Sequence, residues 1–203
     1  MKSEIKSYCL DRIQEFELIP KKRKDLLRKI ADYINHKKDE RTPIQLMYVC
    51  THNSRRSHFG QVWSAVAADF YEIANVLTFS GGTEATEFNG NAIHSLLEIG
   101  FDIITDGESY NPKYTIRFGK DKSTMSFSKV YTDDVNPKEN FAAIMTCSDA
   151  EDNCPFIPGV DLRIATTYED PKHFDGTDQQ SEKYSERCAQ ISRECLYVFS
   201  LVK

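Results

Sequence analysis

The fold is decided by the stretch Cys50-Thr51-His52-Asn53-Ser54-Arg55-Arg56-Ser57. An apolar run at 44–49, typical of a buried strand, comes before it, and residues 56–72, with a helical pattern, come after it. In a tight loop that opens a helix, the backbone N–H groups converge on an anion, and the helix dipole adds to their attraction. A cysteine, five residues and an arginine in this setting therefore predict an oxyanion-binding loop.

The residue types in the loop suit this role. Arg56 can bind two oxyanion oxygens at once, and the same positive field favours the thiolate form of Cys50, the nucleophile. Ser57 can donate a hydrogen bond to that thiolate, and Asn53 tolerates left-handed backbone. His52 either touches the ligand or is an ordinary loop residue. The candidate oxyanion-binding residues are Thr51, His52, Asn53, Ser54, Arg55, Arg56 and Ser57. The alternative is a buried structural cysteine beside a surface arginine.

From residue 44 onward, predicted strands and helices alternate. Strands are expected at 44–49, 76–79, 114–118, 141–146 and 162–166, and helices at 56–72, 88–99 with Gly100 as the cap, and 179–199. This alternation predicts an α/β fold with a parallel sheet and helices on both faces. Residues 106–126 are polar and are expected to form a surface excursion around the single strand 114–118.

The first 40 residues read as a separate helical extension. Two amphipathic helices are expected at 3–18 and 21–36, followed by a polar linker at 36–43. The basic run at 21–24 is most simply a solvated face, with docking of an acidic partner as the second interpretation. The predicted organisation is a helical extension over 1–40 and one main domain over 41–203.

Composition narrows the class of protein. A formal net charge of −5 argues against non-specific nucleic-acid binding, and no apolar run is long enough to span a bilayer. The chain carries no secretory signal pattern, so a cytoplasmic protein is expected. Six cysteines in that compartment are more often reactive or buried than a disulfide framework.

Chemically suggestive residues follow four of the predicted strands. Cys50, Ser80, Cys147 and the segment 168–171 each come directly after a strand. In an open parallel sheet the carboxyl ends of the strands form the ligand-binding edge, so these residues are expected to meet there. A cysteine nucleophile needs an acid for the leaving oxygen, and Asp170 is the first candidate, with Glu169 as the second.

Two cysteines seven residues apart, Cys147 and Cys154, bracket a polar segment. On a helix they would lie roughly 10 Å apart, whereas a disulfide needs Cα atoms about 5.5 Å apart. They can pair only if the segment unwinds, and its Ser, Asp and Asn residues make such a helix marginal. Two isolated structural cysteines are the alternative. No paired histidines support a zinc site, and no metal or cofactor is expected. Packing in the core is expected for Cys9, Cys188 and Cys195.

With these motifs, residues 44–200 resemble the low-molecular-weight protein tyrosine phosphatase superfamily, and specifically its thioredoxin-coupled arsenate reductase branch. The resemblance rests on Cys50-Thr51-x-Asn53-Ser54-x-Arg56-Ser57, on residues 80–84, on residues 146–150 with 153–155, and on Asp170-Pro171. It implies a three-layer sandwich around a parallel four-stranded sheet, of the phosphotyrosine protein phosphatase I type.

The resemblance also implies roles. Cys50 is the nucleophile, Arg56 and the loop amides bind the oxyanion, and Asp170 is the general acid. Cys147 attacks the sulfur of the Cys50–arsenic adduct, and Cys154 then attacks Cys147. The resulting Cys147–Cys154 disulfide is reduced by thioredoxin. Arsenate or a phosphate-like oxyanion is the expected substrate.

The sequence departs from that family at four positions. Arg55 replaces a second loop cysteine, and His52 replaces a glycine. Some relatives bind potassium beneath the loop through acidic residues that align with Gln61 and near Lys129. The resemblance therefore implies that this potassium site is lost and that Lys129 supplies the positive charge. The expected loop supports are Asn53, Ser80, Gln61 and Lys129.

Three functions compete at this point. The first is arsenate reduction by a Cys50, Cys147 and Cys154 relay. The second is phosphomonoester hydrolysis through a Cys50 thiophosphate intermediate, in which water takes the place of Cys147. The third is a non-enzymatic oxyanion or redox sensor that changes shape when Cys147 and Cys154 are oxidised.

Overall fold

The computed structural model describes residues 1–153 and 156–203. The helices are α1 Ser3–Gln14, η1 Phe16–Leu18, α2 Lys21–Asp39, α3 Arg56–Phe70, α4 Gly90–Ile99, α5 Ser148–Asn153, η2 Pro171–Phe174 and α6 Gln180–Ser200. The strands are β1 Ile44–Cys50, β2 Val76–Gly82, β3 Asp102–Thr105, β4 Tyr114–Gly119, β5 Lys122–Ser126, β6 Phe141–Met145 and β7 Val160–Ala165. Within the described residues, no helix is both long and apolar enough to cross a membrane.

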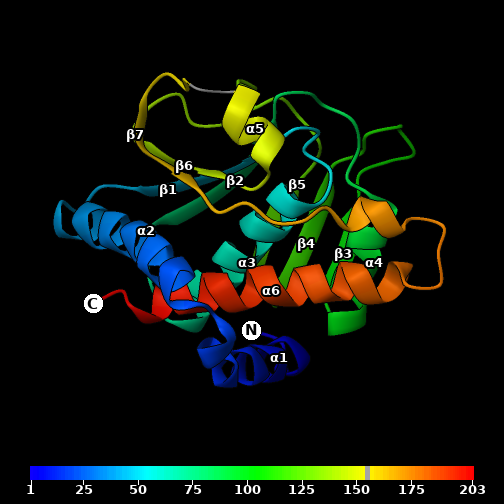
Figure 1. The fold of residues 1–203 in the computed structure, drawn as a ribbon, viewed down its shortest axis with the longest axis horizontal. Coiled ribbons are helices and arrows are strands. Elements are labelled where there is room, and N and C mark those ends of the chain that lie inside the picture. The colour runs from blue at the N-terminus through cyan, green and yellow to red at the C-terminus, as the bar shows by residue number, and fades with distance from the viewer. Residues whose placement is uncertain (154–155) are drawn as a thin grey trace.

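A four-stranded parallel sheet with the order β2-β1-β6-β7 forms the centre of the molecule (Figure 1). The central strands β1 and β6 are almost entirely buried, which explains why their sequences are continuous apolar runs rather than alternating ones. β1 pairs with β2 from Ile44↔Val76 to Cys50↔Gly82, and with β6 up to Val49↔Met145. The predicted α/β fold with a parallel four-stranded sheet is confirmed.

Each face of the sheet packs into its own apolar cluster. On one face, α3, α6 and α2 cover the sheet and form the helix-side core, to which β1 contributes Leu46 and Tyr48. On the other face, the short helix α5 covers the sheet (Figure 1). That smaller cluster, the α5-side core, consists of Met47, Val49, Cys50, Phe141, Ala143, Met145, Cys147, Ala150 and Ile157. These are the three expected layers, with the second helical layer reduced to α5.

Close packing of α3 on the sheet depends on a glycine. A Cβ atom on Gly60 would lie 2.2 Å from the ring of Tyr48, so any larger residue would push α3 off β1. α3 begins at Arg56, so the last two residues of the stretch 50–57 that is predicted to bind an oxyanion belong to this helix. The helix therefore fixes the position of this loop at the carboxyl edge of the sheet.

Both N-terminal helices form, but α1 ends at Gln14 and is followed by the short 3-10 helix η1, whereas one helix was predicted over 3–18. α2 also takes in residues 36–39 of the expected linker. Ile5 of α1 and Leu27, Ile30 and Ile34 of α2 belong to the helix-side core together with residues of the sheet. The division at residue 40 remains a prediction about domains. In packing terms, both helices share one core with the rest of the chain.

Two regions differ from expectation. Residues 102–126 form an antiparallel sheet, β3-β4-β5, where one strand was predicted. The strand β5, Lys-Ser-Thr-Met-Ser, is polar and mostly exposed, so it lacks the apolar signal by which a strand is recognised.

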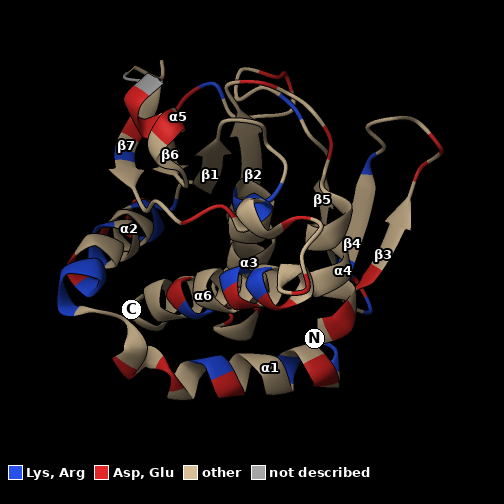
Figure 2. Ribbon diagram, turned by 45° about the vertical axis from the view of Figure 1, so that its right-hand side comes forward, with Lys and Arg blue, Asp and Glu red and all other residues tan. Residues whose placement is uncertain are grey.

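In the basic run at 21–24, Lys21 and Lys22 are exposed, but the side chain of Arg23 is only 17% exposed. Arg23 therefore does not belong to the solvated face predicted for this run. Figure 2 shows the acidic residues of α5, which lies close to β6, in red.

Candidate active site

The loop predicted to bind an oxyanion connects β1 to α3 at the carboxyl edge of the sheet. Asn53 has φ 44°, the left-handed conformation that the sequence predicts for it. The end of β2 passes close beneath the loop: a Cβ on Gly82 would lie 2.6 Å from the carbonyl oxygen of Thr51 and 2.7 Å from the Asn53 nitrogen. Glycine at position 82 is therefore needed for this approach.

Cys50 lies buried at the base of the loop, with 4% of its surface exposed. Its Sγ is 3.1 Å from Ser57 Oγ, and Asn53 Nδ2 donates to the same Ser57 oxygen at 2.9 Å. Because Ser57 accepts a hydrogen bond from Asn53, its own hydroxyl proton is free to point at the sulfur. The structure thus brings Cys50, Asn53 and Ser57 together, with a hydroxyl donor beside the sulfur.

A second buried layer holds Asn53 from below. The Asn53 side-chain oxygen accepts the backbone N–H of Lys129 at 2.9 Å, and the Asn53 carbonyl lies 2.8 Å from His58 Nε2. Ser80 Oγ lies 3.3 Å from the other ring nitrogen of His58. Burial, with the nearby charge of Lys129 adding to it, lowers the pKa of His58 well below its usual 6.5, so the ring is neutral. With Nε2–H donating to Asn53, the Nδ1 atom can accept the proton of Ser80.

The sequence pattern predicts no role for His58, which lies in the first turn of α3. It is fully buried and stacks on Phe88 with ring centroids 4.0 Å apart. Ser80, an expected loop support, reaches Asn53 only through this histidine. The burial that reveals this support role is not visible in the sequence, where His58 is only a histidine that follows the anion-loop motif.

Gln61 and Lys129 line one small cavity of about 210 Å³. Gln61 donates to Thr124 and to the carbonyl of Met125 on β5, so it supports the sheet beside the loop rather than the loop itself. Lys129 is 4% exposed, and burial lowers its pKa to about 8. Its ammonium group lies over the Phe127 ring, 4.5 Å from the centroid. Lys129 contacts the loop through its backbone N–H, which donates to Asn53, and its part as a charge in place of potassium stays a prediction.

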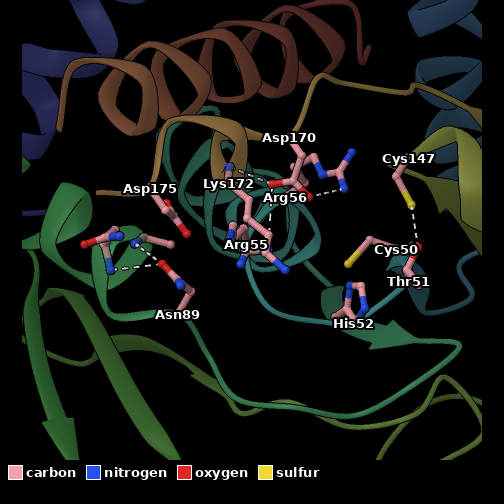
Figure 3. A network of polar contacts seen from close by, with 12 residues as sticks. Cys50, Thr51, His52, Arg55, Arg56, Asn89, Cys147, Asp170, Lys172 and Asp175 are labelled. Atoms are coloured by element: carbon pink, nitrogen blue, oxygen red, sulfur yellow. Dashed lines mark hydrogen bonds and ion pairs between the residues drawn. The ribbon is translucent and has the colours of Figure 1, made fainter. Parts of the chain in front are cut away.

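Arg56 and Asp170 are brought together at the mouth of the loop (Figure 3). Arg56 Nη2 lies 2.6 Å from Asp170 Oδ2, and Arg56 Nη1 donates to the Tyr168 carbonyl at 2.7 Å. Asp170 also caps η2 by accepting the Lys172 N–H at 3.1 Å. The second candidate acid, Glu169, has a side chain that is 91% exposed. The geometry therefore favours Asp170 as the acid.

The remaining loop residues divide by where their side chains go. Arg55 donates to Tyr184 Oη at 3.0 Å and approaches Asp170 at 3.7 Å. His52 lies 3.7 Å from the Glu84 carboxylate, and its side chain is 42% exposed. The Arg55 side chain is thus held by Tyr184 and by the candidate acid Asp170, and that of His52 lies near Glu84. The part of these two side chains in binding an oxyanion stays a prediction.

Cys147 lies next to the loop because of the strand order. In the order β2-β1-β6-β7 the strands β1 and β6 are neighbours, and the chain runs outward from them in opposite directions. Beyond their paired residues, the Thr146 N–H donates to the Val49 carbonyl at 2.7 Å. Cys50 and Cys147 therefore leave adjacent strands one residue apart, which places their Cα atoms roughly 6 Å from each other. Disulfides span this distance. Both cysteines belong to the α5-side core.

Two polar groups of the described residues lie close to the Cys147 thiol. Its Sγ lies 3.4 Å from Thr51 Oγ1, as Figure 3 shows, and the Ala150 N–H of α5 donates to it at 3.4 Å. The polar segment that follows Cys147 forms the short helix α5. Cys154 lies outside the described residues. Among the described residues, no group of three or more His, Cys, Asp or Glu side chains could hold a metal ion.

A cavity of about 660 Å³ opens beside this site. Its lining includes Arg56 and Asp170, the aromatic side chains of Tyr168 and Phe174, and Arg187 of α6. This volume is far larger than a tetrahedral oxyanion requires. The site therefore has room for a substituent on the oxyanion.

No protein-family model matches the chain. Arsenate reductase from Bacillus subtilis (strain 168) is 24% identical over 143 residues, which cover 70% of this chain and 84% of that protein. Arsenate reductase 2 from Staphylococcus haemolyticus is 29% identical over 114 residues, covering 56% and 67%. The predicted sequence resemblance to arsenate reductases is confirmed.

Solved structures agree on the fold. An arsenate reductase in the phosphate-binding state superposes with a TM-score of 0.54 at 16% identity, covering 79% of this chain and 99% of that one. A low-molecular-weight phosphotyrosine phosphatase from Vibrio cholerae O395 gives a TM-score of 0.52 at 13% identity, covering 77% and 95%. The fold is that of the low-molecular-weight phosphatases.

Proposed function

We propose that this chain, which has the low-molecular-weight phosphatase fold and is similar in sequence to bacterial arsenate reductases, reduces arsenate to arsenite through Cys50, Cys147 and Cys154. The observation that carries the proposal is the placement of Cys147. Its thiol contacts Thr51, the residue after Cys50, in the small apolar cluster that both cysteines share. A phosphatase mechanism requires only the first cysteine.

In the first step arsenate binds to the loop amides and to the free N–H groups of Arg56. The bound oxyanion competes with Asp170 for the arginine, and this frees the Asp170 carboxyl group to carry a proton to the departing oxygen. The Cys50 thiolate, with Ser57 as its donor, attacks arsenic. A sulfur–arsenic bond forms, and one arsenate oxygen leaves as water.

In the second step the Cys147 thiolate attacks Cys50 Sγ. A disulfide forms between these two cysteines, and the electron pair of the sulfur–arsenic bond goes to arsenic, which leaves as arsenite. Cys154 then attacks Cys147, which releases the Cys50 thiolate and leaves a Cys147–Cys154 disulfide. Because α5 separates those two residues, it must unwind for this exchange.

A dithiol must reduce the final disulfide, and thioredoxin in the cytoplasm is the donor that we propose. The decisive assay is arsenate-dependent oxidation of NADPH coupled through thioredoxin and its reductase. Cys147→Ser and Cys154→Ser should each abolish turnover, whereas Cys188→Ala, a core cysteine, should not. Undiminished turnover in a variant that lacks both Cys147 and Cys154 would rule out the relay. Mass-spectrometric mapping after arsenate treatment should find a Cys50–Cys147 or Cys147–Cys154 bridge.

Phosphomonoester hydrolysis is the second candidate function, and the large cavity beside Arg56 and Asp170 favours it. That cavity can hold the organic leaving group of a phosphomonoester, which arsenate lacks. In this reaction water hydrolyses a Cys50 thiophosphate, so Cys147 is dispensable. Full turnover of p-nitrophenyl phosphate by Cys147→Ser, together with no arsenate reduction by the wild type, would establish this function instead.

A further inference from the structure

The N-terminal helix α2 contacts the loop that carries Asp170 through a buried ion pair. Arg23 Nε and Nη2 donate to Glu194 Oε2 of α6 at 2.9 and 2.8 Å. The Arg23 side chain is 17% exposed and that of Glu194 is 4% exposed. An ion pair this deeply buried is costly to form unless further hydrogen bonds satisfy its members.

Those further hydrogen bonds come from the segment that leads to Asp170. Arg23 Nη2 donates to the carbonyl of Thr166 at 3.1 Å, directly after β7. Tyr168 Oη donates to the same Glu194 oxygen at 2.8 Å, and the Arg23 guanidinium lies over the Tyr168 ring, 4.7 Å from its centroid. We call Arg23, Glu194 and Tyr168 the α2 brace.

The brace ends at the two residues that the proposed chemistry uses. The carbonyl of Tyr168, whose ring Arg23 covers, accepts the hydrogen bond from Arg56 Nη1 at 2.7 Å. Two residues later, Asp170 pairs with Arg56 Nη2. The position of the Tyr168 backbone therefore sets the orientation of the Arg56 guanidinium and the place of the Asp170 carboxylate.

We propose that Arg23 is a positioning residue, which fixes the segment 166–170 through Glu194 and Tyr168 and thereby places the Asp170 carboxylate. The helix α2 is then part of the catalytic apparatus and not only a covering layer. This inference rests on the proposed function, since it takes Asp170 as the general acid.

A displaced general acid can be distinguished from a general loss of stability by comparing two substrates with different leaving groups. Phenyl phosphate has a poor leaving group that needs protonation, whereas the leaving group of p-nitrophenyl phosphate departs with little help. Arg23→Met should lower kcat/KM on phenyl phosphate about tenfold and change it less than about twofold on p-nitrophenyl phosphate. Arg23→Lys should recover part of the loss, because it keeps the positive charge beside Glu194.

The matched control is Arg28→Met, since Arg28 lies on the same helix with a side chain that is 54% exposed. It should leave kcat/KM on both substrates unchanged. If Arg23→Met alone does not fold because Glu194 loses its partner, the double variant Arg23→Met/Glu194→Gln removes the unpaired carboxylate and keeps an acceptor for Tyr168. Equal behaviour of the Arg23 and Arg28 variants, or equal losses on the two substrates, would overturn the inference.

A second measurement does not depend on activity. Amide hydrogen exchange of the peptide that spans 166–170 should speed up about tenfold or more in Arg23→Met and stay at the wild-type rate in Arg28→Met. Unchanged exchange in the Arg23 variant would overturn the brace. In contrast, an Asp170→Asn variant with wild-type kcat/KM on phenyl phosphate would overturn the role of Asp170 in the proposed function, even where exchange still supports the brace.

Discussion

The two faces of the central sheet hold cysteines that are equally buried and chemically different. Cys9, Cys188 and Cys195 lie in the helix-side core, and Cys50 and Cys147 lie in the α5-side core. All five are at most 4% exposed. Burial raises the pKa of each helix-side thiol to about 12, which leaves it protonated and unreactive.

What separates the two groups is position relative to the carboxyl edge of the sheet. Cys50 and Cys147 follow adjacent parallel strands, so they lie where backbone amides, hydroxyl groups and Arg56 converge. The helix-side thiols lie along α1 and α6 against aromatic side chains, for example Trp63 beside Cys188. The lesson is that the exposed fraction of a cysteine does not indicate its chemistry, whereas its place in the topology does.

The largest effect should come from replacing Cys50. Cys50→Ser should lower kcat/KM for arsenate and for p-nitrophenyl phosphate by at least about 10³-fold, because serine is a far weaker nucleophile in this setting. The free energy of unfolding should change little. Cys188→Ala is the control from the other face and should keep kcat/KM within about twofold of wild type. Similar losses of activity in both variants would contradict the chemical difference between the two groups of cysteines.

Asp170 should follow in size. Asp170→Asn keeps the shape of the side chain but cannot donate its proton, so we expect kcat/KM on phenyl phosphate to fall about 10²-fold or more. Glu169→Gln, one residue away and largely exposed, is the matched control and should have no such effect. A larger loss in the Glu169 variant would exchange the roles of the two carboxylates.

The sheet and most of the site could be predicted from the sequence because both depend on local patterns. A continuous apolar run followed by a polar loop and a helix fixes β1, Cys50 and α3, and the alternation of elements places Cys147 at the same edge. Here the spacing of residues along the chain determines their positions in space. The reductase reading needed one more local signal, the pair Cys147 and Cys154.

The parts that could not be predicted depend on contacts between distant residues. The support given by His58 needs Asn53 and Ser80 around it, and nothing in the sequence shows that they meet. Arg23 looked like one charge in a solvated run, yet its partner Glu194 is 171 residues away. The strand β5 forms through pairing with β4 rather than through an apolar pattern of its own.

The buried ammonium group of Lys129 should make the free energy of unfolding depend on pH. The pKa of Lys129 in the folded protein, about 8, lies below the ordinary 10.5. Below pH 8 the lysine is therefore protonated in both the folded and the unfolded protein. There the burial of its charge lowers the free energy of unfolding by the full amount, about 3 kcal/mol. Between pH 8 and 10.5 the unfolded chain binds more protons, and the free energy of unfolding therefore rises with pH. Lys129→Met should stabilise the protein at pH 7 by up to about 3 kcal/mol, and the gain should fade toward pH 10.5.

Urea unfolding of the wild type and Lys129→Met at pH 7 and pH 10 measures this difference. Because methionine keeps the backbone N–H that binds Asn53, the loop geometry should survive the change. A gain in stability that is the same at both pH values would mean that packing, and not the buried charge, produces it.

The smallest effect should come from the helix-side core itself. Cys188→Ala removes one buried sulfur and leaves Trp63 Nε1 without its acceptor at 3.2 Å. A small cavity and a lost hydrogen bond together should cost about 1–2 kcal/mol in the free energy of unfolding, with kcat/KM unchanged. Cys188→Ser, which restores an acceptor for Trp63, should cost less if the hydrogen bond dominates and more if the apolar surroundings do. Should Cys188→Ala instead reduce turnover without reducing stability, a thiol on the helix side would be acting in the reaction, and the division of the cysteines by sheet face would be wrong.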